Sequence, residues 1–236
     1  WLDALTNYLS ALNFPNTKDK LYKNFWPASL HVIGKDILRF HAIYWPAFLL
    51  AAKIDPPKRV FGHGWILSGD EKMSKSKGNI LNPIEIIDAY GIDELRYYLM
   101  KEVSHGRDGS ISLKSLENCI NSDLANNYGN LCQRVFAFIR NNCQNIAVNT
   151  KNLSNSDKKL IEKTGALTKG LKTEMDNQNL NNYIKSVVDI SFLTNKYIND
   201  ESPWKLKEKN REKMNNILHI ALEQIAKISI LLDPII

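Results

Sequence analysis

Residues 62–79 constrain most strongly how this chain can fold. A glycine-flanked apolar run, Gly62 to Leu67, turns over at Ser68-Gly69-Asp70 and is followed by three lysines with serines between them, from Lys72 to Lys77. Lysine ammonium groups are compact cations with rotatable donors, which suit free phosphate oxygens. The pattern predicts a strand that delivers a phosphate-binding loop, and a solvated Lys/Ser loop is the alternative.

The preceding residues supply the rest of a β-α-β unit. Leu30 to Ile33 predicts a buried parallel strand, and Gly34-Lys35-Asp36 follows it. A helix is predicted from Ile37 to Tyr44, where Pro46 forces a break or a restart, and the next strand is predicted over Arg59–Ile66. Because ligands bind beyond the carboxyl ends of the strands in open α/β sheets, both turns are expected near one cleft.

The second half of the chain is predicted to be helical. Asn82-Pro83 is a helix start and Gly91 a helix end, and Asp3 and Asp93 are predicted to cap the helices that follow them. From Ser112 onward, apolar residues recur at helical spacing and predict an antiparallel bundle. The helical stretches are 113–120, 131–139, 160–175 (interrupted by Gly165 and Gly170), 180–198 and 209–232, with a polar linker over Asn149 to Ser156.

Bulk composition narrows the class of protein. The 236 residues are 44% hydrophobic and 24% charged, and the net charge of +6 favours a polyanionic partner without proving one. Cys119, Cys132 and Cys143 show no C-x-x-C spacing, which argues against a zinc site or a disulfide framework and for reduced thiols in the cytoplasm. No apolar run is long enough for a membrane span, and no signal peptide is seen, so no membrane partner is expected.

Several motifs carry a family resemblance. Lys72-Met73-Ser74-Lys75-Ser76 resembles the KMSKS signature loop of the class I aminoacyl-tRNA synthetases. Trp1-Leu2-Asp3-Ala4, His31 to Ile37 and Trp45-Pro46-Ala47 are similar to the methionyl-tRNA synthetase family, and not to its leucyl, valyl or isoleucyl relatives. The resemblance extends from Trp1 to beyond Trp204.

This resemblance implies an α/β nucleotide-binding fold (Rossmann-like, second half only) followed by an all-α anticodon-binding helical bundle. Residues 1–81 would form the catalytic part with the KMSKS loop, 82–111 a connecting stem-contact region, and 112–236 the bundle. The second class I signature, His-Ile-Gly-His, does not occur, since His31-Val32-Ile33-Gly34 continues to Lys35. The chain is therefore expected to be the C-terminal part of a longer synthetase and to form no methionyl-adenylate alone.

The reaction implied by the resemblance joins methionine to tRNA(Met), initiator tRNA included, through a methionyl-adenylate made from ATP with Mg²⁺. Lys72 and Lys75 would be catalytic because they neutralise charge on the departing phosphates, and Ser74 and Ser76 would donate hydrogen bonds to phosphate. The ATP-binding set is completed by Gly34 and Asp36 at the ribose and by His63 to Ile66 at the adenine. Gly62 and Gly64 could equally be simple strand-end glycines.

Four residues match the methionine pocket of the family: Trp1, Tyr8, Ala28 and His31. A thioether is soft and polarizable and packs well against aromatic faces. A Tyr hydroxyl and a His ring offer donors to sulfur, and such a site rejects analogues that lack the bonded atom. Taken alone, the two aromatic residues are as readily core side chains, and His31 is as readily a satisfied core histidine.

Three residues match the family's anticodon readers: Asn130, Arg134 and Trp204. Asn130 and Arg134 are four apart and share a helix face, and an amide and a guanidinium suit base edges. Trp204 would stack on a base of the CAU anticodon. A surface Asn/Arg pair and a core tryptophan are the alternatives, and lysines 205, 207 and 209 suit phosphates or a solvated face.

The sequence leaves two other functions open. One is a non-catalytic tRNA-binding module on the same scaffold, although such a module needs neither the lysine loop nor the methionine pocket. The other is a different class I synthetase, which the Trp1, Tyr8 and His31 set disfavours. The intact enzyme is expected to be a cytoplasmic monomer with no zinc site in this part.

Overall fold

The computed structural model describes residues 1–69, 71–73, 81–104, 106–144 and 152–236, with the backbone alone for residues 71 and 72. The chain forms two compact units. Unit 1 is Trp1–Leu67 with His105–Gly109, and unit 2 is Ser68–Ser104 with Ser110–Ile236.

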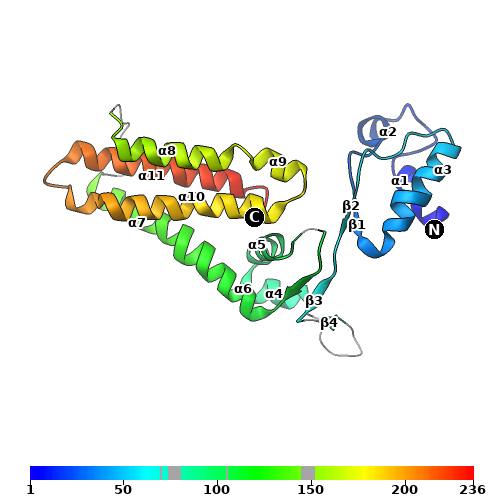
Figure 1. The fold of residues 1–236 in the computed structure, drawn as a ribbon, viewed down its shortest axis with the longest axis horizontal. Helices are drawn as coiled ribbons and strands as arrows, with labels where there is room; N and C mark the ends of the chain where they lie inside the picture. The colour runs from blue at the N-terminus through cyan, green and yellow to red at the C-terminus, as the bar shows by residue number, and fades with distance from the viewer. Residues whose placement is uncertain (70, 74–80, 105, 145–151) are drawn as a thin grey trace. The chain divides into compact units, whose positions relative to one another are not determined.

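Unit 1 consists of a pair of parallel strands and several short helices (Figure 1). Its elements are α1 (Leu2–Ser10), α2 (Lys20–Phe25), β1 (His31–Gly34), a 3₁₀ turn (Lys35–Ile37), a π-helical segment (Phe40–Tyr44), α3 (Trp45–Ala51) and β2 (Val60–His63). The core of unit 1 consists of Leu5, Leu9, Trp26, Trp45 and Leu49. Pro46 lies in the first turn of α3. The helical backbone continues from the π-helical segment into α3 without a gap, so the predicted break is not seen. A first-turn position tolerates proline, which has no N–H to donate.

The strands β1 and β2 confirm the predicted parallel pair, with His31 opposite Val60 and Gly34 opposite His63. The prediction of one strand over 59–66 was wrong, because β2 ends at His63 and β3 (Ile66–Ser68) is separate. Gly64 lies at the interruption, where an added Cβ would sit 2.0 Å from the carbonyl oxygen of Arg107. The segment that follows Arg107 presses on the backbone here and diverts the strand.

A second, three-stranded sheet has the order β4-β3-β5, with β4 at Glu71–Lys72 and β5 at Gly109–Ile111. The boundary between the two units falls within β3 and β5.

Unit 2 is otherwise helical. Its helices are α4 (Pro83–Tyr90), α5 (Ile92–Glu102), α6 (Leu113–Cys119), a π-helical segment (Ile120–Gly129), α7 (Asn130–Asn142), α8 (Asn155–Thr168), α9 (Leu171–Asp176), α10 (Leu180–Glu201), a 3₁₀ turn (Pro203–Lys205) and α11 (Arg211–Leu232). Helix α10 packs against α5, α7, α8, α9 and α11, and Figure 1 shows α8, α10 and α11 lying alongside one another. The facing side chains of α10 and α11 are fully buried: Ile184, Val187, Ile190, Met214, Ile217, Ile220 and Ala221.

Local capping chemistry sets several helix ends. The Asn82 side chain accepts a hydrogen bond from the backbone N–H of Ile84 at 3.0 Å, and Gly91 ends α4 with a φ of 108°. Both features were predicted. Asp3 and Asp93 lie inside the first turns of α1 and α5 and are not the capping residues, so those two predictions were wrong.

The architecture therefore agrees with the coarse prediction of an α/β part followed by a helical part, and the three-stranded sheet β4-β3-β5 was not predicted. The Rossmann-like assignment, the anticodon bundle and the division at residues 81 and 111 stay predictions. None of the described helices is both long and apolar enough to cross a membrane.

Candidate functional site

Tyr8, His31 and His41 form an aromatic cluster in unit 1. Tyr8 comes from α1, His31 opens β1, and His41 lies in the π-helical segment. The Tyr8 hydroxyl is 3.0 Å from Nε2 of His41, whose Nδ1 is 3.0 Å from the carbonyl oxygen of Ile37. Since a carbonyl only accepts, Nδ1 carries the proton. In the neutral ring, Nε2 therefore accepts a hydrogen bond from Tyr8.

The surroundings of His31 favour its uncharged ring. It is only 7% exposed, and burial, with a smaller effect of His41, lowers its pKa from the ordinary value of 6.5. Its Nε2 is buried and has no hydrogen-bond partner among the described residues. The ring of Tyr8 packs on it, with centroids 4.4 Å apart. A neutral imidazole beside a phenol ring is suited to an apolar, polarizable ligand group.

The structure brings three of the four predicted methionine-site residues to one pocket. Tyr8, Ala28 and His31 line a cavity of about 490 Å³. Trp1 does not line it and is 55% exposed. Its ring stacks on Phe40 with centroids 3.9 Å apart.

His41 is the residue that sequence reasoning missed. It contacts Tyr8, and its ring lies 6.4 Å from Trp1 and 6.3 Å from His31, centroid to centroid. It thereby links Trp1 to the other side chains of the cluster. A helix was predicted over this stretch, but no local signal shows that α1 brings the Tyr8 hydroxyl to His41.

The residues predicted to bind the nucleoside lie at the carboxyl ends of β1 and β2. Gly34 and His63 are register partners there. Asp36 follows in the 3₁₀ turn, and its carboxylate lies close to Gly34, where an added Cβ would meet Oδ1 at 2.6 Å. Ile66 begins β3 and is largely exposed.

Asp108 ties this strand-end region together. Its Oδ1 accepts hydrogen bonds from Lys35 Nζ at 2.5 Å and from the backbone N–H of Trp65 at 2.8 Å. The carbonyl oxygen of Trp65 accepts from the N–H of Gly109 at 2.9 Å. The turn after β1 and the segment after β2 are thus both fixed to residues 108 and 109.

The lysine loop lies mostly outside the described residues. The backbone of Lys72 belongs to β4, while Ser74, Lys75 and Ser76 are among the residues that the structure does not describe. Met73 is described and packs, partly buried, against the core of unit 2.

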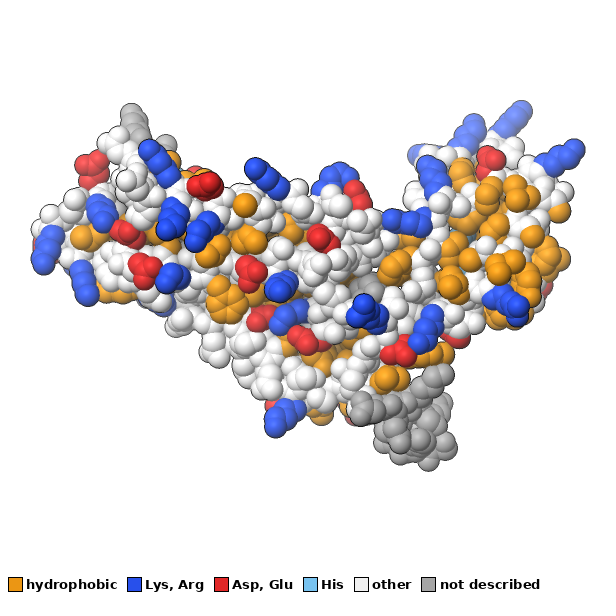
Figure 2. Space-filling model, viewed as in Figure 1, with side chains coloured by type: hydrophobic (Ala, Val, Ile, Leu, Met, Phe, Trp, Pro, Cys, Tyr) orange, Lys and Arg blue, Asp and Glu red, His pale blue; other side chains and the backbone are white. Residues whose placement is uncertain are grey.

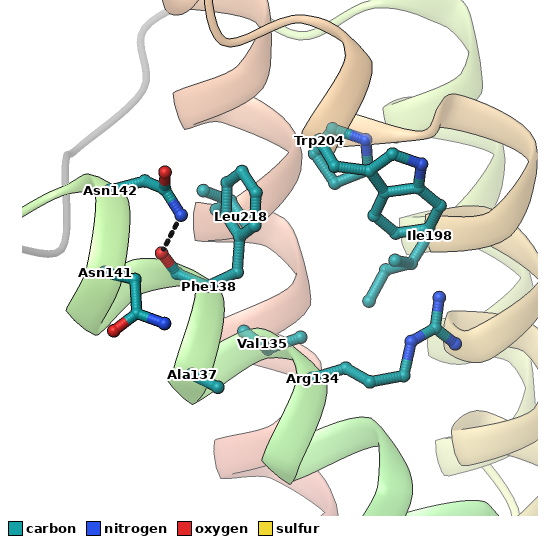
Figure 3. Close-up of a pocket in the computed structure, with 10 residues that line it drawn as sticks. Arg134, Val135, Ala137, Phe138, Asn141, Asn142, Ile198, Trp204 and Leu218 are labelled. Carbon is teal, nitrogen blue, oxygen red and sulfur yellow. Dashed lines mark hydrogen bonds between the residues drawn. The ribbon is translucent and has the colours of Figure 1, made fainter.

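Arg134 and Trp204 lie together in unit 2, although they are far apart in the sequence. Arg134 projects from α7, and its guanidinium carbon lies 5.3 Å from the centroid of the Trp204 ring (Figure 3). It also donates a hydrogen bond to Oδ1 of Asn199 at 2.7 Å. Trp204 is 42% exposed and stands in the turn after α10. Asn130 is exposed at the start of α7, one turn before Arg134.

These two residues border a pocket of about 320 Å³, as Figure 3 shows. Its remaining walls are apolar side chains and two asparagines: Val135, Ala137, Phe138, Ile198, Pro203, Leu218, Asn141 and Asn142. An exposed indole face beside a fixed cation can stack a flat heteroaromatic ring, and the amides can bond its edge. Asn130 does not line this pocket.

The part of the chain that the structure describes contains no group of three or more His, Cys, Asp or Glu side chains able to hold a metal ion.

A family model matches the first part of the chain, and curated relatives and a solved structure match all of it. The family model described as tRNA synthetases class I (M) matches residues 1–136. Methionine–tRNA ligases from Brucella suis and Rickettsia felis are 41% identical over 236 residues and 42% identical over 239 residues; in both matches 100% of this chain aligns with 46% of the relative. Mycobacterium tuberculosis methionyl-tRNA synthetase in complex with methionyl-adenylate has a TM-score of 0.95 and 38% identity, with 100% of this chain and 47% of that chain covered. The chain thus spans about half the length of the curated relatives it matches.

Proposed function

This chain belongs to the class I tRNA synthetases (M), and we propose that it forms part of a methionine–tRNA ligase. In the proposed reaction the methionine carboxylate attacks the α-phosphate of the substrate Mg²⁺-ATP and expels pyrophosphate. A terminal ribose hydroxyl of tRNA(Met), initiator tRNA included, then attacks the carbonyl carbon of the adenylate, and AMP leaves. No covalent enzyme intermediate is needed, so the protein aligns the reactants and neutralises charge. A cytoplasmic monomer remains our prediction for the intact enzyme.

One observation carries the proposal: Arg134 and Trp204 converge on an exposed pocket, at positions that match the family's anticodon readers. The Trp204 indole is 42% exposed beside the Arg134 guanidinium, so its ring is accessible to a stacking partner. Unpaired bases of a tRNA loop are recognised by stacking on such rings and by hydrogen bonds to their edges. We therefore assign this pocket to a base of the CAU anticodon and Asn130 to a neighbouring base.

The aromatic cluster of unit 1 supports methionine as the amino acid. We assign Trp1, Tyr8, Ala28 and His31 to the methionine side chain, with His41 holding the Tyr8 hydroxyl in place. Neutral rings suit a thioether because sulfur is polarizable and would gain little from a charged partner. The low pKa of His31 favours that neutral state.

The nucleotide would lie at the carboxyl ends of β1 and β2. We assign Gly34 and Asp36 to the ribose and His63 and Ile66 to the adenine, supported by the adjacency of Gly34 and His63 in the sheet register. Lys72 and Lys75 are proposed to neutralise the departing phosphates, and Ser74 and Ser76 to donate hydrogen bonds to them.

The experiment is a titration of the purified chain with two RNA stem-loops that differ only in carrying CAU or another anticodon. We expect tighter binding of the CAU RNA. Trp204→Ala is expected to lose about 1 to 3 kcal/mol, a 5- to 150-fold rise in Kd, and with it the preference for CAU. Phe192→Ala is the control, because Phe192 is an exposed aromatic residue of α10 outside the pocket. Equal binding of both RNAs by the unmodified chain would refute the assignment.

The ligase activity itself is tested with the full-length gene product. Methionine-dependent exchange of pyrophosphate into ATP, followed by charging of tRNA(Met), is the expected result. RNA binding without any exchange would instead assign the chain to a non-catalytic tRNA-binding protein.

A further inference from the structure

The connection between α10 and α11 is strongly basic and directly follows Trp204. We call residues 205–211 the basic connection; its cationic residues are Lys205, Lys207, Lys209 and Arg211, with Glu208 as its acidic residue. All four cationic residues are exposed. None of them forms an ion pair with another residue that the structure describes. Figure 2 shows Lys and Arg side chains gathered at the end of unit 2 where α10 joins α11.

The backbone of the basic connection is anchored, so these cations are not on a loose tail. Pro203 is buried, and Leu206 packs against the core of unit 2. The N–H of Asn210 donates to the carbonyl oxygen of Leu206 at 2.8 Å, and the Asn210 side chain caps α11 by accepting from the N–H of Lys213 at 2.9 Å. An anchored backbone lowers the entropic cost of holding several cations against one ligand.

The nearest acidic group on α10 is already engaged. Glu201 accepts from Lys213 at 2.8 Å, and this hydrogen bond lowers the pKa of Glu201. Its negative charge is therefore balanced locally by a lysine outside the basic connection. With Glu208 counted against its four cationic residues, the basic connection carries a net charge of +3 and attracts an external anion.

A stacking ring followed by a run of cations is how proteins bind single-stranded nucleic acid, with bases on the ring and the backbone along the cations. We propose that the basic connection binds the sugar-phosphate backbone of the RNA strand whose base stacks on Trp204. The inference rests on the proposed function of the Trp204 pocket. An acidic protein or an anionic lipid surface would pair with the cations, but neither would account for the exposed Trp204 ring and the pocket beside it.

The test is the salt dependence of RNA binding by the full chain. Each phosphate contact contributes about 0.7 to 0.9 to the slope of log K against log salt concentration. Single changes of Lys205, Lys207, Lys209 or Arg211 to Gln are therefore expected to reduce the slope by about that amount, and to weaken CAU and non-CAU stem-loops equally. Lys172→Gln is the matched control, since Lys172 is exposed on α9 and already paired with Asp176 at 2.6 Å; it should leave the slope unchanged.

Unchanged slopes in all four variants would overturn the proposal. So would a loss confined to the CAU RNA, because it would mean that these residues read bases. Loss of affinity for phosphatidylserine vesicles with the RNA slope unchanged would assign the segment to a membrane surface. Trp204→Ala distinguishes the anticodon-base assignment from the backbone contact, since it should abolish the preference for the CAU RNA and leave the salt dependence of binding unchanged. If the unmodified chain shows no CAU preference but the lysine variants still lower the slope, the anticodon assignment fails and the backbone contact stands.

Discussion

Replacing Tyr8 by phenylalanine is expected to destabilise unit 1 by about 1 to 3 kcal/mol, the cost of leaving one buried hydrogen-bonding group unsatisfied. The group in question is Nε2 of His41, which is 2% exposed and accepts from the Tyr8 hydroxyl at 3.0 Å. It cannot turn to another partner without breaking the bond between Nδ1 and the carbonyl oxygen of Ile37. The ring of Tyr8 stays, so packing against His31 is kept and the loss isolates the hydroxyl.

Urea unfolding followed by tryptophan fluorescence measures this loss. Of the five tryptophans in the chain, four lie in unit 1, so fluorescence reports mainly on that unit: Trp1, Trp26, Trp45 and Trp65. With a urea slope of about 1 kcal/mol per M, typical of a small domain, the midpoint should fall by about 1 to 3 M.

Tyr44→Phe is the control for Tyr8→Phe. Tyr44 lies in the same unit and is exposed, and its hydroxyl makes no hydrogen bond with the described residues. Its loss should cost less than about 0.5 kcal/mol. Equal effects of the two changes would refute the hydrogen-bond reasoning. In the proposed ligase, Tyr8→Phe should also raise KM for methionine and leave KM for ATP unchanged, because the change falls in the pocket that we assign to methionine.

Three further outcomes are expected from unit 2 and the strand ends. Tyr197→Phe removes a hydrogen bond of 2.5 Å to a buried carboxylate, so urea unfolding followed by circular dichroism should show a loss of about 1.5 to 3 kcal/mol. Burial, and then the hydrogen bond to a carboxylate, raises the pKa of Tyr97 and of Tyr197. The stability that these two protonated hydroxyls contribute is complete below the unfolded pKa of about 10 and is lost above it. The free energy of unfolding should therefore fall from about pH 10 upward, and less steeply in the variant with both tyrosines changed to Phe. Gly64→Ala should destabilise unit 1 because its Cβ would meet the carbonyl oxygen of Arg107 at 2.0 Å, whereas Gly165→Ala in α8 meets nothing within 4 Å and should stabilise by about 0.5 to 1 kcal/mol.

Features set by adjacent residues were predictable from the sequence. Asn82 and Pro83 start α4 and Gly91 ends it, because each effect depends on a side chain and its own backbone. Gly165 shows the limit of the same reasoning. A glycine inside an apolar helical pattern was expected to interrupt the helix, yet α8 continues through it to Thr168. The packing of α8 against α10 outweighs the small conformational cost of one glycine.

Features set by distant residues were not predictable. The strand predicted over 59–66 breaks because residues 107–109 press on Gly64 and bond the backbone of Trp65. His41 joins the candidate site only because α1 brings the Tyr8 hydroxyl to it. Such contacts depend on the three-dimensional arrangement, which no local pattern encodes.

Arg134 and Asn130 share a face of α7, and the sequence alone gives no reason to separate their roles. The structure does separate them, because Arg134 contacts the ring of Trp204 and lines the pocket, while Asn130 does not line it. Residues in contact show coupling energies of about 0.5 to 3 kcal/mol in double-mutant cycles, whereas well-separated ones add to within about 0.5 kcal/mol. For CAU stem-loop binding, Trp204→Ala with Arg134→Ala should therefore be strongly non-additive. Trp204→Ala with Asn130→Ala should be nearly additive, since Asn130 would meet a different nucleotide. If the coupling energy between Trp204 and Asn130 were as large as that between Trp204 and Arg134, all three residues would contact one base, and the assignment of separate bases would be wrong.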